Sequence, residues 1–255
     1  MSAFLKTALM AAAGLVIAAP SGAEEAPLTP PEYVAQAKEV FMKSIGFRTV
    51  EHGGQFKAYA DYLAGVLKAG GIPAKDIEFI PMGDTLAMVA TLRGSGEGKP
   101  LLLSGHLDVV EAKPEDWERD PFTAVEENGF IYGRGASDMK FGVTMLTVTL
   151  ARLKKEGFAP KRDVILVFSG DEETEMTTTA ALAKRFADAE LLLNADGGGG
   201  LLSEDNNPVA YYVQGAEKTY ADFRVEFTNP GGHSSAPRAD NAIYDLAKAI
   251  ANIEA

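Results

Sequence analysis

The sequence contains no cysteine among its 255 residues, and this absence excludes every structure and site that needs a thiol. No disulfide can stabilise the fold, and neither a thiolate zinc site nor a cysteine nucleophile can form. The chain is also poor in histidine, with only His52, His106 and His233. Any metal site must therefore be built from imidazole and carboxylate groups.

Positive charge and long apolar runs are scarce as well. The sequence has 24 basic and 36 acidic residues, and this excess of negative charge argues against nucleic acid and anionic membranes as partners. The apolar run from Thr7 to Ala19 is short for a membrane span, which needs about 20 residues. With Lys6 before this run and small residues at Ser21 and Ala23, residues 1–23 are expected to be a secretory signal peptide. The mature protein would then be periplasmic or secreted, and an uncleaved anchor is the alternative.

The apolar content of 46% is enough for a substantial core, and its periodicity predicts alternating helices and strands. The expected elements are, in chain order, helices at 33–44 and 56–67, strands at 77–81, 86–93 and 100–104, a helix at 139–156, a strand at 163–169, a helix at 177–187 and a strand at 191–195. This alternation implies parallel strands joined by crossover helices. We therefore expect an α/β fold, a three-layer α/β/α catalytic domain with a mostly parallel sheet, over residues 24–207.

The pattern changes after the glycine run at 197–200. Residues 209–214 and 219–228 alternate apolar and polar side chains, which predicts a pair of antiparallel strands. A helix is expected over 241–254. Residues 208–255 thus look like the beginning of a second, α+β domain that is incomplete, because one strand pair and one helix are too little for a stable module.

The segment P-L-L-L-S-G-H-L-D, residues 100–108, runs an apolar strand into His106 and Asp108. In extended backbone these two side chains point to the same side, so the carboxylate can orient the imidazole. A lone histidine at a strand end is more often structural. Further carboxylates downstream favour metal binding for this one.

Four of these carboxylates follow apolar runs or precede a helix. Asp138 has an alternative reading as a helix N-cap. Glu172 and Glu173 are adjacent, so their side chains should point to opposite sides and do different work, although a solvated acidic loop is a fair competitor. Asp196 is followed by four glycines and is a weak signal alone.

Together these acids form a strong signal. Carboxylates gathered at strand ends would repel one another unless cations neutralised them. Two divalent ions bridged by Asp138 would do so, and such a pair can polarise a carbonyl and activate water. Imidazole and carboxylate ligands suit zinc, with cobalt or manganese as alternatives.

Five motifs occur in order in the sequence: S-G-H-L-D-V-V, W-E-R-D-P-F, I-Y-G-R-G-A-S-D-M-K, S-G-D-E-E and G-G-H-S-S-A-P. Together they closely resemble the co-catalytic di-zinc metallopeptidases that include aminoacylase-1, carboxypeptidase G, carboxypeptidase S and succinyl-diaminopimelate desuccinylase. The resemblance covers roughly residues 33–255. It implies a metallopeptidase or amidohydrolase that cleaves dipeptides or N-acyl amino acids through a metal-activated water.

The resemblance also implies a role for each site residue. His106 and Asp196 would bind the first zinc, Asp138 would bridge both ions and Glu173 would bind the second. It further implies a cis peptide bond between Asp138 and Met139.

Three remaining roles follow in the same way. Asp108 would steady the ring of the histidine ligand, and Glu172 would be the general base. His233 resembles a lid-domain histidine that holds the substrate oxyanion, often across a homodimer formed through the lid. A plain loop histidine is the alternative for His233.

Family members supply a last histidine for the second zinc after the lid, and no residue of this sequence matches it. The chain therefore resembles a member truncated at its C-terminus. An inactive fragment that at most binds metal is the alternative to an active hydrolase.

Overall fold

The computed structural model describes residues 29–254 apart from positions 198, 206, 217–220, 234 and 237. The expected signal peptide, residues 1–23, lies outside the described residues. The chain divides into two compact units, and the boundary between them falls between Val213 and Gln214. Each unit is described by itself.

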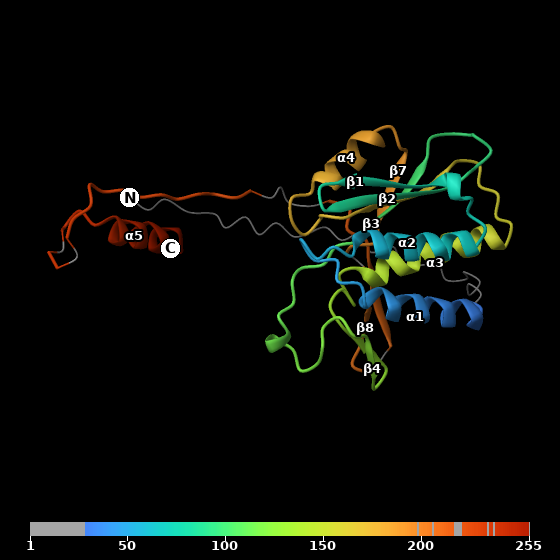
Figure 1. Ribbon diagram of the computed structural model, residues 1–255, viewed down its shortest axis with the longest axis horizontal. Helices are drawn as coiled ribbons and strands as arrows, with labels where there is room; N and C mark the ends of the chain where they lie inside the picture. The colour runs from blue at the N-terminus through green and yellow to red at the C-terminus, as the bar shows by residue number, and fades with distance from the viewer. Residues whose placement is uncertain are drawn as a thin grey trace, which may run out of the picture. The chain divides into compact units, whose positions relative to one another are not determined.

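The first unit is built around a five-stranded sheet with the order β1-β2-β6-β3-β7 (Figure 1). Its strands are β1 (Ile77–Met82), β2 (Thr85–Leu92), β3 (Leu101–His106), β6 (Val164–Ser169) and β7 (Leu191–Asn194). β2 is antiparallel to both of its neighbours, whereas β3 is parallel to β6 and to β7. All strands except β2 therefore run in one direction, which confirms a mostly parallel sheet.

Helices cover both faces of this sheet (Figure 1). α2 (Phe56–Ala69) and α3 (Lys140–Lys155) pack on one face, and α1 (Pro31–Ile45) packs against α3. α4 (Thr177–Arg185) packs on the opposite face, against β2 and β6. The predicted three-layer α/β/α arrangement is confirmed.

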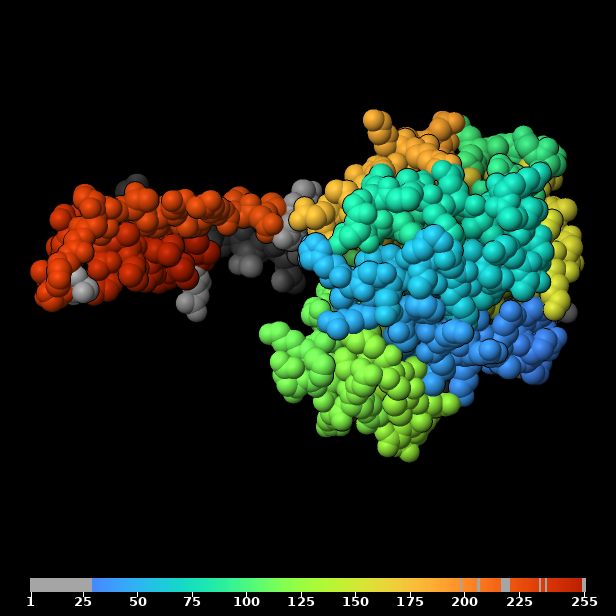
Figure 2. All heavy atoms as spheres, viewed as in Figure 1, coloured from blue at the N-terminus to red at the C-terminus, as the bar shows by residue number. Residues whose placement is uncertain are grey.

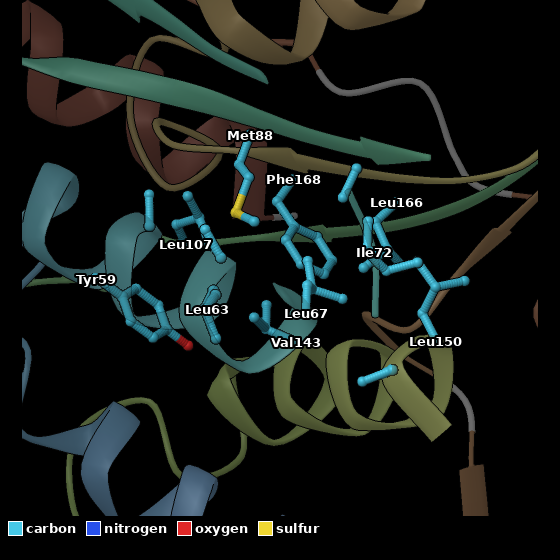
Figure 3. Packing of buried hydrophobic residues seen from close by; sticks show 14 of the residues in the cluster. Tyr59, Leu63, Leu67, Ile72, Met88, Leu107, Val143, Leu150, Leu166 and Phe168 are labelled. Atoms are coloured by element: carbon cyan, nitrogen blue, oxygen red, sulfur yellow. The ribbon is translucent and has the colours of Figure 1, made fainter. Parts of the chain in front are cut away.

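The main core lies between the sheet and the layer formed by α2 and α3. Figure 3 shows Leu63 of α2 on the same side of the sheet as Met88 of β2 and Phe168 of β6, and all three are fully buried. On the other face, Leu182 of α4 packs with Val167. Burial of each such side chain is worth about 1.5–3 kcal/mol. Because helices cover both faces, β6 is buried along its whole length.

The second helix shows how the sequence sets an element's limits. Its buried stripe follows the predicted helical spacing: Phe56, Tyr59, Leu63 and Leu67. The helix ends at Ala69, and the N–H of the following Gly70 donates to the Val66 carbonyl at 3.1 Å. Gly71 follows with a φ of 95°, a left-handed conformation that glycine adopts without strain.

A short hairpin stands apart from the main sheet and is an element that apolar periodicity did not indicate. It pairs β4 (Val125–Glu127) with β5 (Phe130–Tyr132). The turn residues Asn128 and Gly129 have φ angles of 52° and 84°, so the Asn-Gly dipeptide was the available signal. Figure 2 shows the hairpin region, in green, beside the blue surface of α1, where Lys38 pairs with Glu126 at 2.6 Å.

The antiparallel pair expected over 209–214 and 219–228 is wrong. β9 (Pro208–Tyr212) pairs instead with β8 (Gly199–Leu202), and the described residues 221–228 contain no strand. A short turn closes the β8–β9 hairpin, with the Ser203 N–H donating to the Asn207 carbonyl at 2.9 Å.

The second unit contains α5 (Ala242–Glu254), close to the predicted limits. Before it, Arg238 and Asp240 form an ion pair at 2.6 Å. Nowhere among the described residues is there a helix with the length and hydrophobicity needed to cross a bilayer.

Candidate metal centre

The candidate site lies at the carboxyl ends of three parallel strands. In the register of the sheet, His106 at the end of β3 is opposite Ser169 at the end of β6. On the other side of β3, Ser104 is opposite Asn194, the last residue of β7. The residues that follow these ends therefore meet at one edge, where ligands of such sheets gather.

His106 is almost completely buried, with 1% of its surface exposed. Its Nδ1 lies 3.0 Å from the backbone carbonyl oxygen of Asp108 and 3.3 Å from that residue's Oδ1. Both oxygens favour a proton on Nδ1, which leaves Nε2 directed at the site. The expectation that Asp108 lies beside the ring is thus met in the geometry.

Asp138 meets the other side of the imidazole. Its Oδ1 lies 2.9 Å from Nε2 of His106, and its side chain is 61% exposed. The alternative reading as a helix N-cap is wrong, because the N-cap position of α3 is Met139 and no side chain caps this helix. The peptide bond between Asp138 and Met139 is cis, as the resemblance implies.

The acids that follow β6 and β7 complete the cluster. Nε2 of His106 lies 3.7 Å from Oδ2 of Asp196 and 4.0 Å from Oε2 of Glu172. A carboxylate oxygen of Glu173 lies within 4.8 Å of the ligand atoms of His106 and Asp138. The backbone N–H of Glu173 donates to Oδ2 of Asp108 at 2.8 Å. The adjacent glutamates therefore face different partners, as their positions in the sequence suggested.

Two sets of side chains have ligand atoms within 4.8 Å of one another. One set is His106, Asp138 and Glu173, and the other is His106, Glu172 and Asp196. Each set offers one imidazole nitrogen and two carboxylate oxygens, donors that zinc accepts. The residues present therefore fit one or two divalent cations.

The pKa shifts at this edge have the direction expected for crowded acids. Burial raises the pKa of Glu172, and the negative charge of Asp196 raises it further. The pKa of Glu173 is raised by burial first and then by Asp138. Burial lowers the pKa of His106, but Asp108 and the neighbouring carboxylates raise it more strongly, to about 9. A bound cation would relieve this repulsion.

Several supporting residues escaped the sequence analysis. Asp171 accepts hydrogen bonds from the backbone N–H groups of Thr177 at 2.8 Å and Thr178 at 3.0 Å, and also from both hydroxyls. It thereby holds the loop of Glu172 and Glu173 against α4. The only signal was an acid six residues before a threonine run, which many loops share.

Gly142 supports the site through close packing. A Cβ at this position would lie 3.2 Å from both the Cβ and the carbonyl oxygen of Ala195, the residue before Asp196. It would also lie 2.7 Å from the Cε of Met139. Glycine therefore lets α3 approach the chain at the point where it delivers Asp196.

The two remaining histidines lie elsewhere. His52 is a surface residue, with Nδ1 2.5 Å from Oδ2 of Asp84. His233 belongs to the second unit, where its Nδ1 and the Ser235 hydroxyl oxygen are 2.7 Å apart. Its proposed contact with substrate stays a prediction.

Comparison with known proteins places the chain in a family. The family model described as Peptidase family M20/M25/M40 matches residues 102–254, more than half of the chain. That range includes every site residue named above, from His106 to His233.

Two curated relatives illustrate the match. The mouse N-fatty-acyl-amino acid synthase/hydrolase PM20D1 is 34% identical over 172 residues, which cover 64% of this chain and 34% of that protein. Carboxypeptidase S of Saccharomyces cerevisiae is 33% identical over 181 residues, which cover 67% of this chain and 31% of that protein. The chain spans about a third of the length of the curated relatives it matches.

The fold has a counterpart among solved structures. The di-peptidase Dug1p from Saccharomyces cerevisiae superposes with a TM-score of 0.58 at 19% sequence identity, over 68% of this chain and 40% of that one. At this identity the likeness concerns the fold.

Proposed function

Because this chain belongs to the peptidase family M20/M25/M40, we propose that it forms the metal-binding part of a hydrolase that cleaves amide bonds. The proposed substrates are dipeptides or N-acyl amino acids, in line with the names of the relatives. One observation carries the proposal. Side chains that follow β6 and β7 and one that precedes α3 converge on Nε2 of His106, at the end of β3.

The proposed cofactor is zinc, as one or two ions, with cobalt or manganese as alternatives. His106 and Asp196 would hold the first ion, Asp138 would bridge and Glu173 would hold the second. Bound there, these ions polarise a carbonyl oxygen and lower the pKa of water. The mixture of imidazole and carboxylate oxygen in both ligand sets supports zinc over magnesium.

Glu172 is the proposed general base. Burial and the charge of Asp196 raise the pKa of its carboxyl, which makes the carboxylate a stronger base, and the carboxylate faces the cluster. It would take a proton from the attacking water and return it to the leaving nitrogen. The second proton of the water would also end on the leaving nitrogen, so the products at neutral pH would be a carboxylate and a protonated amine.

The test is hydrolysis by the full chain of a panel of dipeptides and N-acyl amino acids, with Zn²⁺, Co²⁺ or Mn²⁺ added. Glu172→Gln should keep metal binding and lose about 10²–10⁴-fold in rate. Glu175→Gln, an exposed glutamate in the same loop, is the matched control and should retain the rate. Metal uptake without turnover of any substrate by the wild-type chain would overturn the proposal.

We also propose export, with cleavage after Ala23. N-terminal sequencing of the protein recovered from the periplasm or medium would test this, because the mature chain should begin at Glu24. An intact N-terminus in the cell pellet would contradict it.

Residues 208–255 are proposed to begin a lid domain through which two copies associate. His233 would then hold the substrate carbonyl oxygen as charge develops on it. Sedimentation should show a dimer, and His233→Ala should lower the catalytic rate constant more than it changes KM. A monomer with an unchanged rate constant would contradict both parts of this proposal.

A further inference from the structure

Lys140, the first residue of α3, is fully buried. Its Nζ donates to the Ser44 carbonyl at 2.8 Å and to the Phe47 carbonyl. The same atom lies 4.9 Å from the centroid of the Tyr59 ring, within the range of a cation–π contact. A lysine with no exposed surface is rare in proteins and needs partners of this kind.

This position runs against the usual rule for helices. A basic residue in the first turn opposes the helix dipole, which favours negative charge there. Lys140 avoids this unfavourable interaction with the dipole of α3 because its side chain extends to a different helix. Ser44 lies in the last turn of α1, where carbonyl oxygens carry partial negative charge and lack helical partners.

The same residue also closes the loop that precedes α3. The backbone N–H of Lys140 donates to the Gly135 carbonyl at 2.9 Å. A Cβ on Gly135 would lie 3.1 Å from both Cγ and Cδ of Lys140, so the lysine stem lies directly against this glycine. Asp138 is inside the loop that these contacts define.

The neighbouring Met139 anchors the loop on its other side. Met139 is buried, and its Sδ accepts a hydrogen bond from the backbone N–H of His106 at 3.1 Å. Asp138 is therefore followed by two buried residues, one fixed to β3 and one fixed to α1. Its own side chain is 61% exposed and contacts Nε2 of His106 at 2.9 Å.

We propose that Lys140 is a positioning residue that ties the loop Gly135–Lys140 to the end of α1 and so holds the Asp138 carboxylate beside His106. The proposal rests on the proposed function where it treats Asp138 as a metal ligand. The alternative is a lysine that contributes only to general stability. The two alternatives predict different effects of replacing Lys140: a positioning role predicts a local loss of order in the loop, and a purely structural role predicts lower stability throughout the chain.

The test compares Lys140→Met, which keeps the length of the side chain and removes its donors, with Leu150→Ala. Leu150 is fully buried in the same helix, and its truncation leaves a cavity without touching the loop. Hydrogen exchange of residues 133–139 is measured on the metal-free full chain. Cobalt affinity and the cobalt absorption spectrum are measured on the same proteins.

Lys140→Met should speed exchange at 133–139 at least tenfold relative to the strands of the sheet. It should also weaken cobalt binding about 10–100-fold and alter the spectrum. Leu150→Ala should lower global stability and leave the loop and the spectrum unchanged. Should Lys140→Met fail to fold, the milder Lys140→Gln should show the same changes at smaller size.

Loop exchange and cobalt affinity like those of the wild type, in a folded lysine variant, would overturn the proposal. Failure of the wild-type chain to bind cobalt would instead overturn the proposed function. The hydrogen-exchange comparison needs no metal, so it decides the role of Lys140 in either case.

Discussion

The carboxylate of Asp108 joins two candidate ligands, because its Oδ2 accepts the backbone N–H of Glu173 at 2.8 Å while its Oδ1 lies 3.3 Å from Nδ1 of His106. One buried side chain thus fixes both the orientation of the imidazole and the position of the loop after β6. Asp108 is itself 3% exposed, so little freedom remains in the arrangement. Residues that support a metal ligand in this way tune its affinity for the ion.

Replacement of Asp108 by asparagine should weaken metal binding about 10–100-fold. The amide can accept one of the two contacts and not both, so either the ring or the Glu173 loop loses its support. Competition with a chelator of known affinity measures the change. The matched control is Asp76→Asn, a buried acid paired with Arg93 at the opposite end of the sheet. It should leave metal affinity unchanged, and equal losses in both variants would contradict this account.

Metal binding should release protons at neutral pH. The pKa of His106 in the metal-free chain is raised to about 9, so the imidazole is protonated at pH 7.5, whereas a metal ligand must be neutral. We expect about one proton released per chain, and an apparent affinity that rises about tenfold per pH unit up to about pH 9. Calorimetry in two buffers with different ionisation enthalpies measures the proton count. Binding without proton release at pH 7.5 would contradict the prediction.

Asp171→Ala should destabilise the chain by about 1–2 kcal/mol at pH 7, since it removes the acceptor for the start of α4. Burial raises the pKa of Asp171, but hydrogen bonds from Thr177 and Thr178 lower it more, so the net shift is downward. The contribution of a depressed carboxyl is present above its unfolded pKa of about 3.8 and is lost as pH falls through the folded value.

Urea unfolding at pH 7 and at successively lower pH measures this difference between the two proteins. The difference in free energy of unfolding between the two proteins should become smaller as the pH is lowered. Asp188→Ala, in which the lost side chain is 88% exposed, should change stability by less than about 1 kcal/mol. A gap for Asp171→Ala that stays constant down to the acid side would contradict the pKa argument.

Two glycines in helices should respond to alanine in opposite ways. Gly65 of α2 has no atom within 4 Å of an added Cβ, so Gly65→Ala should stabilise the chain by about 1 kcal/mol through helix propensity. Gly142→Ala should instead destabilise it by about 1–2 kcal/mol, because the methyl group meets Ala195 and Met139. It should also weaken metal binding, since Ala195 precedes Asp196. Equal stabilisation by both changes would show that the contact at Gly142 is not tight.

Much of this arrangement could be predicted from local pattern. The strands ending at His106, Ser169 and Asn194 are apolar runs of ordinary length, and their parallel order puts the following acids at one edge. The carboxylates near His106 can therefore be identified from the sequence. The alternation of helices and strands also indicated the three layers.

Other features depend on contacts that sequence spacing does not reveal. The burial of Lys140 depends on its contact with the Ser44 carbonyl at the end of α1, which is 96 residues away in the sequence. The described residues 221–228 share the alternating pattern of true strands but belong to no sheet, so the pattern alone did not distinguish them. The Asn128-Gly129 hairpin was readable in principle, but its strands are short and mostly exposed, so periodicity gave no signal.

The central claim is that a divalent cation binds where His106, Asp138 and their neighbouring acids meet. Crystals of the zinc-loaded chain, with data collected at the zinc absorption edge, test it most directly. The account predicts an anomalous peak about 2.0–2.1 Å from Nε2 of His106, with a carboxylate oxygen of Asp138 also bound to the ion. An occupied zinc peak elsewhere, with none at Nε2 of His106, would contradict it.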